Sequence, residues 1–317
     1  MVATIGGMDR VLVATAVPAA PHLPAVLGAW RLEPVTLALL AASAVLYLAG
    51  VRRVAELHPR NAWPRSRTGA FLAGLAAIGL ALLSPIDTYA EVLFSIHMVQ
   101  HMLLTTVAAP LLVLGTPVSL LLRAAGRSRH RQVMRVLRSW PVTALTHPVV
   151  AWVGFAAVMW GTHLSGLYDA ALRSPPLHAA EHALFLVSAV LLWWPVVGLE
   201  PSHWRLPHPL RVGYVFLQSP VNTFLALVLY SSSRVLYPAY AATGRTWGPT
   251  PLDDLHAGAA IMWIGGDLVF LLATVLGIAA WMRHEDVVSA RIDAELAAQR
   301  ARAAAAAKPP APGQPAS

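Results

Sequence analysis

Long apolar segments alternate with short polar segments along most of the chain. A helix needs about 20 mostly apolar residues to cross the hydrocarbon core of a bilayer, which is well above the 11–12 residues of an average soluble helix. Several segments contain Pro, Gly or Ser, which membrane helices tolerate. The pattern predicts seven transmembrane helices, over residues 34–51, 69–85, 92–114, 146–162, 179–199, 210–231 and 256–282.

The composition supports a membrane protein, because 57% of the residues are hydrophobic and only 12% are charged. Soluble domains carry about 25% charged residues. We therefore expect an all-α, polytopic integral membrane protein with one membrane domain over residues 31–285. Residues 1–30 are expected to form an N-terminal extension, although the apolar stretch after Arg10 also fits a weak signal segment. Residues 286–317 are expected to form a partly disordered cytoplasmic tail that begins as a helix.

The arginines predict the orientation of the helices. Most of the 23 basic residues fall in alternate loops, at 52–67, 123–138 and 205–211, and in the tail at 283–308. Loops rich in Lys and Arg stay on the cytoplasmic side. The N-terminus is then outside and the C-terminus inside, as expected for a multi-pass protein of a bacterial cytoplasmic membrane. The net charge of +8 is explained by this topology, so we expect lipid rather than nucleic acid as the partner of the basic residues.

Histidines gather near the predicted outer surface. The stretch "SIHMVQHMLL" places His97 and His101 four residues apart, and "LHAAEHALF" does the same for His178 and His182. Residues four apart share one face of a helix, and ionisable groups in membrane helices usually face the bundle interior. A shared metal or haem site is therefore predicted near the outer surface. Its candidate ligands are His97, His101, His163, His178, His182 and His256.

The neighbours of these histidines favour copper as the metal. Imidazole suits copper, zinc, iron and nickel, whereas thioether sulfur favours monovalent copper. Met98 and Met102 follow the first two histidines and are candidate ligands. Glu181 is expected to accept a hydrogen bond from the second ring nitrogen of a ligand. Asp267 lies deep in the last predicted helix, where it is either a functional acid or a hydrogen-bond partner of a neighbouring helix.

Other chemistry is weighed against this metal site. "HAAEH" fits a short zinc-peptidase pattern, but a peptidase needs a further ligand and a water-filled cleft. Cysteine is absent, as are the G-x-S-x-G and phosphate-loop patterns, so we do not expect an enzyme. A haem held between histidines of two helices stays an alternative, although paired ligands on one helix fit a compact ion better. A copper or other solute transporter also stays open, with few polar groups at depth beyond Gln218, Asn222 and Asp267.

Four stretches also carry a family resemblance: "HMVQHMLLTTVAAPLLVLGTP", "WGTHLSGLYDAAL", "LHAAEHALFLVSAVLLWWP" and "HAGAAIMWIGGD". Together, over about residues 30–285, they resemble the CtaG-like family of seven-helix membrane proteins, which are cytochrome c oxidase assembly factors. The resemblance implies copper delivery to a haem–copper oxidase by ligand exchange, with oxidase subunits and a periplasmic copper chaperone as partners. The histidines characteristic of the family correspond here to the six candidate ligands, and its acidic position corresponds to Asp267.

Overall fold

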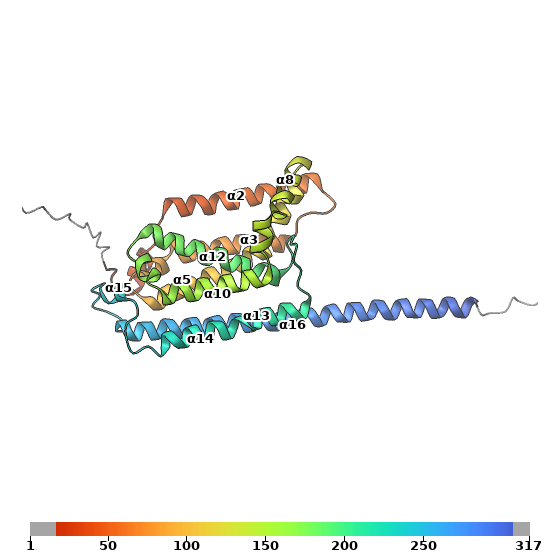
Figure 1. Ribbon diagram of the computed structural model, residues 1–317. Coiled ribbons are helices and arrows are strands. Elements are labelled where there is room, and N and C mark those ends of the chain that lie inside the picture. The colour runs from red at the N-terminus through yellow and green to blue at the C-terminus, as the bar shows by residue number, and fades with distance from the viewer. Residues whose placement is uncertain (1–16, 307–317) are drawn as a thin grey trace, which may run out of the picture.

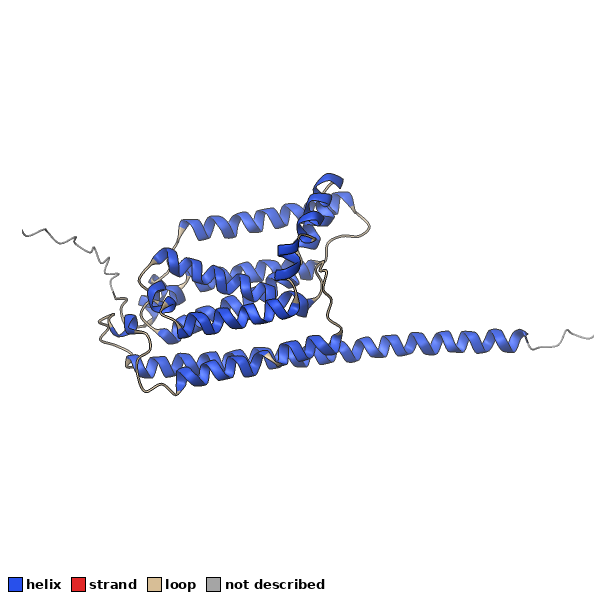
Figure 2. Cartoon of the chain, viewed as in Figure 1, coloured by secondary structure: helices blue, strands red, loops and turns tan. Residues whose placement is uncertain are grey.

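The computed structural model describes residues 17–306. Helices are the only regular elements in that part of the chain, which confirms the all-α prediction (Figure 2). Each predicted segment coincides with a helix or a run of helices, and the starts differ by at most five residues, whereas the third segment continues to residue 124 and the last to residue 306. These are α2 (Pro34–Leu57), α3 (Arg65–Leu83), the run α5 (Phe94–Met102), η1 (Leu103–Ala108), α6 (Ala109–Leu114) and α7 (Pro117–Ala124), then α10 (Pro148–Leu164), α12 (Pro175–Val197), α13 (His208–Phe216) with α14 (Gln218–Tyr230), and α16 (Pro251–Ala306).

Six of these helices or runs are long and apolar enough to cross a membrane, within residues 17–306. The seventh, α10, is apolar but has 17 residues, which corresponds to about 25 Å at helical rise. It packs along α12 on one side (Figure 1), and Val149, Val150 and Val153 on it are exposed. The protein is thus a multi-pass helical bundle with six candidate spans, and the count of seven stays a prediction.

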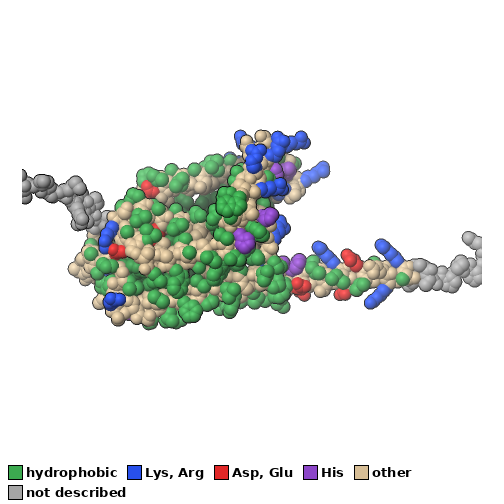
Figure 3. All heavy atoms as spheres, viewed as in Figure 1, with side chains coloured by type: hydrophobic (Ala, Val, Ile, Leu, Met, Phe, Trp, Pro, Cys, Tyr) green, Lys and Arg blue, Asp and Glu red, His purple; other side chains and the backbone are tan. Residues whose placement is uncertain are grey.

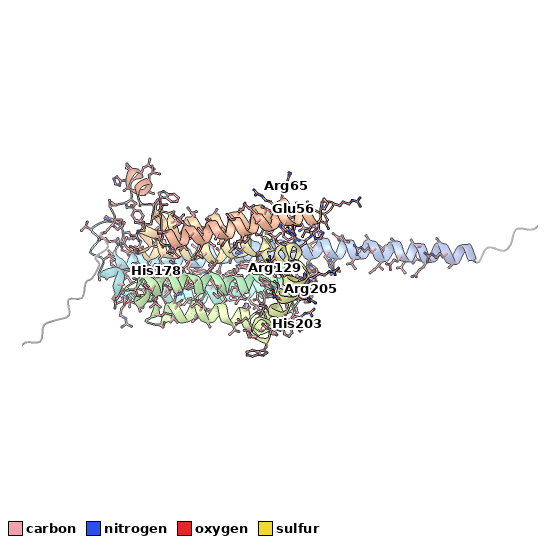
Figure 4. All side chains as sticks on the ribbon, turned by 90° about the horizontal axis from the view of Figure 1, so that it is seen from above. Glu56, Arg65, Arg129, His178, His203 and Arg205 are labelled. Carbon is pink, nitrogen blue, oxygen red and sulfur yellow. The ribbon has the colours of Figure 1, made fainter. Side chains whose placement is uncertain are left out.

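The two ends of the bundle differ in charge. Lys and Arg side chains gather at one end, where α8 (Arg127–Leu137) crosses the helix ends (Figures 1 and 3). Arg65, Arg129 and Arg205 lie at this end, whereas His178 lies toward the other (Figure 4). We call them the arginine end and the histidine end. The asymmetry used by the positive-inside rule is therefore present in three dimensions, and the orientation itself stays a prediction.

Two helices begin on a carboxylate that comes from a distant part of the chain. The side chain of Asp254, in α16, accepts hydrogen bonds from Phe94 N at 2.7 Å and from Ser95 N at 3.3 Å, at the start of α5. At the arginine end, Glu200 accepts from Val118 N and Ser119 N, both at 2.8 Å, at the start of α7. The first N–H groups of a helix have no partner within it. These two buried carboxylates supply that partner and join the helices.

The third span widens into the π-helix η1, in which one backbone carbonyl accepts a hydrogen bond from another helix. In π-helical register the carbonyl of Thr105 would accept from residue 110, but Pro110 has no N–H. The indole N–H of Trp193, from α12, donates to this carbonyl at 2.9 Å instead. Trp193 thus satisfies this carbonyl and joins α12 to the π-helix, which begins at Leu103, next to the turn that carries His101.

The sixth span and α16 share a polar seam. Asp267 accepts hydrogen bonds from the hydroxyl of Thr223 and from the side-chain amide of Asn222. A Cβ at Gly266 would lie 2.5 Å from the Asn222 amide nitrogen, so the two helices approach too closely for any larger residue there. Of the two alternatives for Asp267, the structure shows the hydrogen bond to a neighbouring helix.

The described segments at the two ends of the chain differ in their contacts with the bundle. Pro18 and Ala19 accept hydrogen bonds from Trp247 and Tyr89, so the described part of the N-terminal extension packs on the histidine end. Most of the possible signal segment lies outside the described residues. At the other end α16 continues without a break through residue 285 to Ala306 and projects past the bundle (Figure 1). The rest of the predicted tail, 307–317, lies outside the described residues.

Candidate metal centre

Three helices bring five histidines together at the histidine end. The ring centroids of His97 and His178 lie 5.2 Å apart, those of His97 and His101 lie 4.2 Å apart, and those of His178 and His182 lie 4.3 Å apart. The ring centroid of His163, from α10, lies 6.4 Å from that of His101. We call these five residues the histidine cluster. The i,i+4 pairs of α5 and α12 therefore face each other, as the sequence pattern predicts.

The cluster is closed off from solvent on most sides. His97 is fully buried, and His101, His163 and His182 expose between 3% and 7% of their surface. His178 is only partly buried and forms the rim of the cluster. A buried imidazole nitrogen without a hydrogen bond costs free energy in an apolar environment. The hydrogen bond or free lone pair of each ring nitrogen therefore decides what the cluster can bind.

The hydrogen bonds of Tyr240 determine which nitrogen of His97 carries the proton. The Tyr240 hydroxyl donates to the carbonyl of Ala90 at 3.1 Å and lies 3.1 Å from Nδ1 of His97. Because its one proton is used on the carbonyl, this hydroxyl accepts from Nδ1–H. Burial raises the pKa of Tyr240 well above its ordinary value, so the hydroxyl keeps its proton. The lone pair of His97 is then on Nε2, inside the cluster.

His163 is fixed in the same tautomer by its own helix. Its Nδ1 lies 2.7 Å from the carbonyl of Met159, which can only accept, so Nδ1 carries the proton. The hydroxyl of Tyr237 donates to the carbonyl of His163 at 3.0 Å and ties this turn of α10 to the loop before α15 (Pro238–Ala241). The free Nε2 lone pair of His163 is therefore also held inside the protein.

Several polar atoms of the cluster are buried and have no hydrogen-bond partner among the described residues. Nε2 of His97 and Nε2 of His101 lie 2.6 Å apart, a contact that requires a proton or a cation. A group of orphaned acceptors in one place is the pattern that a bound cation satisfies. The unpartnered atoms are Nε2 of His163, His178 and His182, Nδ1 of His101, and both carboxylate oxygens of Glu181.

Two overlapping sets of side chains have the geometry to hold a metal ion. One set contains His97, His178 and His182, and the other contains His97, His101 and Glu181. In each set the donor atoms lie within 4.8 Å of one another. Metal–imidazole bonds are about 2.0–2.1 Å long, so small rotamer shifts bring each set onto one ion.

Glu181 has a different place from the one expected. The sequence predicts that it accepts a hydrogen bond from a histidine N–H, but both of its oxygens lack a partner. The carboxylate is 4% exposed and belongs to one of the two metal-binding sets. Its geometry fits a direct ligand, and the backbone carbonyl of Met159 and the hydroxyl of Tyr240 have the orienting role instead.

The two methionines face another helix. A Cβ at Gly258 would lie 3.2 Å from the Met98 side chain, and one at Gly265 would lie 3.6 Å from that of Met102. Both glycines belong to α16, whereas His97 faces α12 across the cluster. Successive residues of a helix are about 100° apart around its axis, which separates each histidine from the methionine after it. We leave Met98 and Met102 out of the ligand set.

His256 is also placed away from the cluster. Its Nε2 lies 2.9 Å from the carbonyl of Ser232, and its ring packs against Tyr230 at 5.4 Å. Tyr230 is the last residue of α14 and Ser232 lies two residues after it, so both partners are near His256 because α14 packs against α16. The helices are thus at similar depth, as predicted, but His256 points to a different neighbour, because depth alone does not fix rotation about the helix axis.

The histidine cluster is surrounded by four aromatic side chains, and the sequence analysis did not indicate these four residues. Phe94 packs against Tyr168, Tyr237 and Tyr240 at centroid distances of 5.8, 5.0 and 6.0 Å. Tyr168 also packs against the rings of His97 and His163. Tyr168 and Tyr240 come from the short helices α11 (Leu167–Ala171) and α15, and Tyr237 directly precedes α15. These elements are too short for an apolar periodicity to mark them. The grouping of the tyrosines in "GLYDA" and "LYPAY" on the predicted outer side is the only signal that the sequence offers.

A polar network lies beside the cluster. The side-chain amide of Gln100 donates to Asp87 at 2.8 Å and to the carbonyl of Ala81 at 2.9 Å. Arg31 donates to both carboxylate oxygens of Glu91 and lies 3.9 Å from Asp87. Burial raises the pKa of Asp87 to about 6, against the opposing effects of the Gln100 hydrogen bond and the Arg31 charge. The network connects the N-terminal segment to α5.

Comparison with known protein families gives a match that covers most of the bundle. The family described as cytochrome c oxidase caa3 assembly factor (Caa3_CtaG) matches residues 45–284. The chain belongs to this family. The match begins within α2, ends within α16 and contains the whole histidine cluster. The resemblance stated from the sequence is thereby confirmed.

Several mycobacterial proteins are also similar to this Caa3_CtaG family member. Relatives from Mycobacterium bovis and Mycobacterium tuberculosis are each 32% identical over 285 residues, and one from Mycobacterium leprae is 30% identical over 284 residues. All three are named only as uncharacterized proteins. Each alignment covers 87% of this chain and 43% of the relative, so the chain spans less than half the length of these relatives. No solved structure matches the chain.

Proposed function

We propose that the protein binds copper through the histidine cluster and supports copper insertion during cytochrome c oxidase assembly. The observation that carries the proposal is the set of buried, unpartnered ring nitrogens gathered in one place, together with the hydrogen bonds that fix the tautomers of His97 and His163. Imidazoles prepared in this way are typical of metal ligands. Membership of an oxidase assembly family supports the connection to the oxidase.

The donor set favours a transition metal over a hard cation. Calcium and magnesium take oxygen ligands, whereas imidazole suits copper, zinc, iron and nickel. Only Glu181 offers oxygen in the two metal-binding sets. Cytochrome c oxidases contain copper, so copper is the metal that connects this donor set to the family. In this role copper is cargo rather than a permanent cofactor.

Delivery requires ligand exchange and no covalent chemistry, so we propose a metallochaperone rather than an enzyme. The partly exposed ring of His178 gives the cluster its access to the surface at the histidine end. We propose that this end faces outward from a bacterial cytoplasmic membrane, with α10 as the seventh span, the N-terminus outside and the C-terminus in the cytoplasm. A periplasmic copper chaperone and an oxidase subunit would then exchange copper at the rim.

Haem binding is the first rival function. A haem needs a flat macrocycle between its two axial ligands. Here the rings of His97 and His101 touch, and His97 stacks on His178 at 5.2 Å with an interplanar angle of 29°. Rings that pack directly against each other leave no slot for a macrocycle between them, which favours a compact ion.

Transport across the membrane is the second rival function. The ring of Phe185 packs against His101 at 4.3 Å, on the side toward the arginine end. Leu104 and Ala108, farther along the third span, are fully buried. An aqueous path needs polar groups at these levels. The buried hydroxyls at this level, those of Thr105, Thr106 and Ser188, donate to carbonyls of their own helices. This arrangement favours a binding site at one end of the bundle over a continuous pathway.

Elemental analysis of the purified protein tests the proposal. The protein is produced in cells grown with copper, purified in detergent, and its metals are measured together with the visible spectrum. We expect copper and no Soret band. In the variant that combines His97→Ala and His101→Ala, copper is expected to be lost while the protein still inserts and elutes as the wild type does.

A matched control removes two histidines that lie at the arginine end. The rings of His208 and His284 stack at 4.6 Å, so replacing both with alanine changes the same number of imidazoles in a similar pair. Copper content is expected to be unchanged in this control. A haem spectrum in the wild type, or equal copper in both double variants, would exclude the proposed site.

A further inference from the structure

The two metal-binding sets have one residue in common. His97 belongs both to the set with His178 and His182 and to the set with His101 and Glu181. The remaining four residues divide cleanly between the sets. Whether the cluster holds one ion or two therefore depends on how many ions His97 can bind.

His97 has one nitrogen available for a metal. Its Nδ1–H donates to the Tyr240 hydroxyl, which in turn donates to the carbonyl of Ala90. Tyr168 lies 3.3 Å from the same hydroxyl, and since the Tyr240 proton is already used, Tyr168 is the donor in that contact. The Tyr240 oxygen therefore accepts twice and donates once, which leaves Nδ1 of His97 protonated. Nε2 offers one lone pair, and one lone pair binds one ion.

We propose that the two sets are alternative positions for a single metal ion, with His97 as the ligand that stays bound while the others exchange. This inference rests on the proposed metal-binding function and adds its stoichiometry and its path. The ion is held either by His178 and His182 at the rim or by His101 and Glu181 in the interior. Both sets cannot be filled at once.

The two positions differ in exposure and in charge. The rim set has three neutral imidazoles and includes the partly exposed His178. The interior set includes the carboxylate of Glu181, which is 4% exposed and has no other cationic partner among the described ion pairs. A bare cation is expensive in a low-dielectric interior unless it is paired. A carboxylate compensates the charge in the interior position, and the rim position gives access.

The exchange leaves protons and electrons balanced. In the metal-free state one proton lies between Nε2 of His97 and Nε2 of His101, and since the His97 proton is on Nδ1, His101 supplies it. When Nε2 of His101 takes the ion, the neutral ring carries its proton on Nδ1, which is buried and unpartnered. His178 and His182 both release the ion as His101 and Glu181 bind it, and the oxidation state of the metal does not change.

Titration with monovalent copper, in competition with a chromophoric chelator, tests the inference. We expect one ion per wild-type chain. His97→Ala is expected to bind none at the cluster. His178→Ala and Glu181→Gln are each expected to keep one ion per chain with affinity lowered about tenfold or more, because loss of an outer partner of a ligand alone costs about 10–100-fold. His284→Ala is the matched control and should equal the wild type.

Each other outcome contradicts the inference in a recognisable way. Two ions per wild-type chain, or one ion kept by His97→Ala, overturns the single-ion arrangement while the proposed metal binding stands. No ion bound to the wild type overturns both. If His97→Ala does not fold, His97→Gln replaces it, and the wild-type stoichiometry decides by itself, since two ions exclude a shared ligand with one lone pair.

Discussion

Two histidine pairs at opposite ends of the bundle have similar distances between their rings but differ in burial. His178 and His182 have ring centroids 4.3 Å apart, and His208 and His284 have theirs 4.6 Å apart. The first pair belongs to a cluster whose other members are almost fully buried, whereas His284 is exposed at the arginine end. Proximity of two imidazoles is therefore no sign of a metal site. The cluster is distinguished by the burial of its unpartnered ring nitrogens and by the fixed N–H groups of His97 and His163.

The same contrast holds for carboxylates beside arginines. Asp87, near Arg31 at the histidine end, exposes 20% of its side chain. Glu56, which pairs with Arg53, exposes 64% of its side chain, and Arg53 exposes 58%. Exposed pairs contribute about 0–1 kcal/mol to stability. Burial at the histidine end thus changes the chemistry of charged groups, and three predictions sharpen this comparison.

The largest effect is expected for the pH dependence of stability at Asp87. Folding raises its pKa from 3.8 to about 6, so the folded protein binds this proton more tightly than the unfolded chain. Its contribution is complete below the unfolded pKa and is lost as the pH rises through the folded pKa, by up to about 3 kcal/mol. Asp87→Asn is expected to remove this decline, measured as the thermal unfolding midpoint in detergent at pH 4 to 7.

A control for this prediction is Glu56→Gln, which removes an exposed carboxylate at the arginine end. It is expected to change stability by less than about 0.5 kcal/mol at every pH. If the wild type and Asp87→Asn show parallel pH profiles, the burial of Asp87 does not control its proton.

The second prediction compares the two carboxylates that cap distant helices. Asp254→Asn and Glu200→Gln each remove a buried, charged acceptor and are each expected to lower the free energy of unfolding by about 2 kcal/mol. Asp254 caps α5, which carries His97 and His101, and Glu200 caps α7 at the arginine end. Only Asp254→Asn is therefore expected to weaken metal binding, measured by chelator competition. Equal affinities of the two variants would show that the cap does not position the cluster.

The smallest effect is expected for Tyr240→Phe. The variant removes the acceptor of the His97 N–H, so the tautomer of His97 is no longer fixed. A fixed tautomer is one of the features that distinguish the cluster from the pair of His208 and His284. Metal affinity is expected to fall about tenfold, because outer partners of ligands contribute 10–100-fold. Tyr89→Phe removes a hydroxyl that donates to Ala19 at the same end and serves as the control. Unchanged affinity in Tyr240→Phe would mean that the tautomer is set by another group.

The sequence predicts helices and faces better than it predicts contacts. Apolar length is sufficient to locate α2 and α12, and i,i+4 spacing places His97 with His101 on one face of α5. Rotation of one helix against another depends on packing. His256 therefore turns toward α14, because Gly258 admits Phe94 of α5 so closely that a Cβ there would lie 2.3 Å from its ring.

The contacts of short helices and irregular turns escape prediction for a related reason. Tyr240 lies 143 residues from His97 in the chain, and no local pattern connects the two. Pro110 leaves the carbonyl of Thr105 in the π-helix without its helical donor, and the N–H that replaces it comes from Trp193 of α12, far away in the chain. Tertiary contacts between distant segments decide both features.

X-ray absorption at the copper edge of the loaded wild-type protein tests the central claim most directly. The buried ring nitrogens of the histidine cluster are expected to give imidazole scattering at about 2.0 Å and no sulfur contribution at about 2.3 Å. A sulfur shell would assign the metal to Met98 or Met102 on the α16 side of α5. Absence of imidazole scattering would place copper outside the cluster and contradict the account.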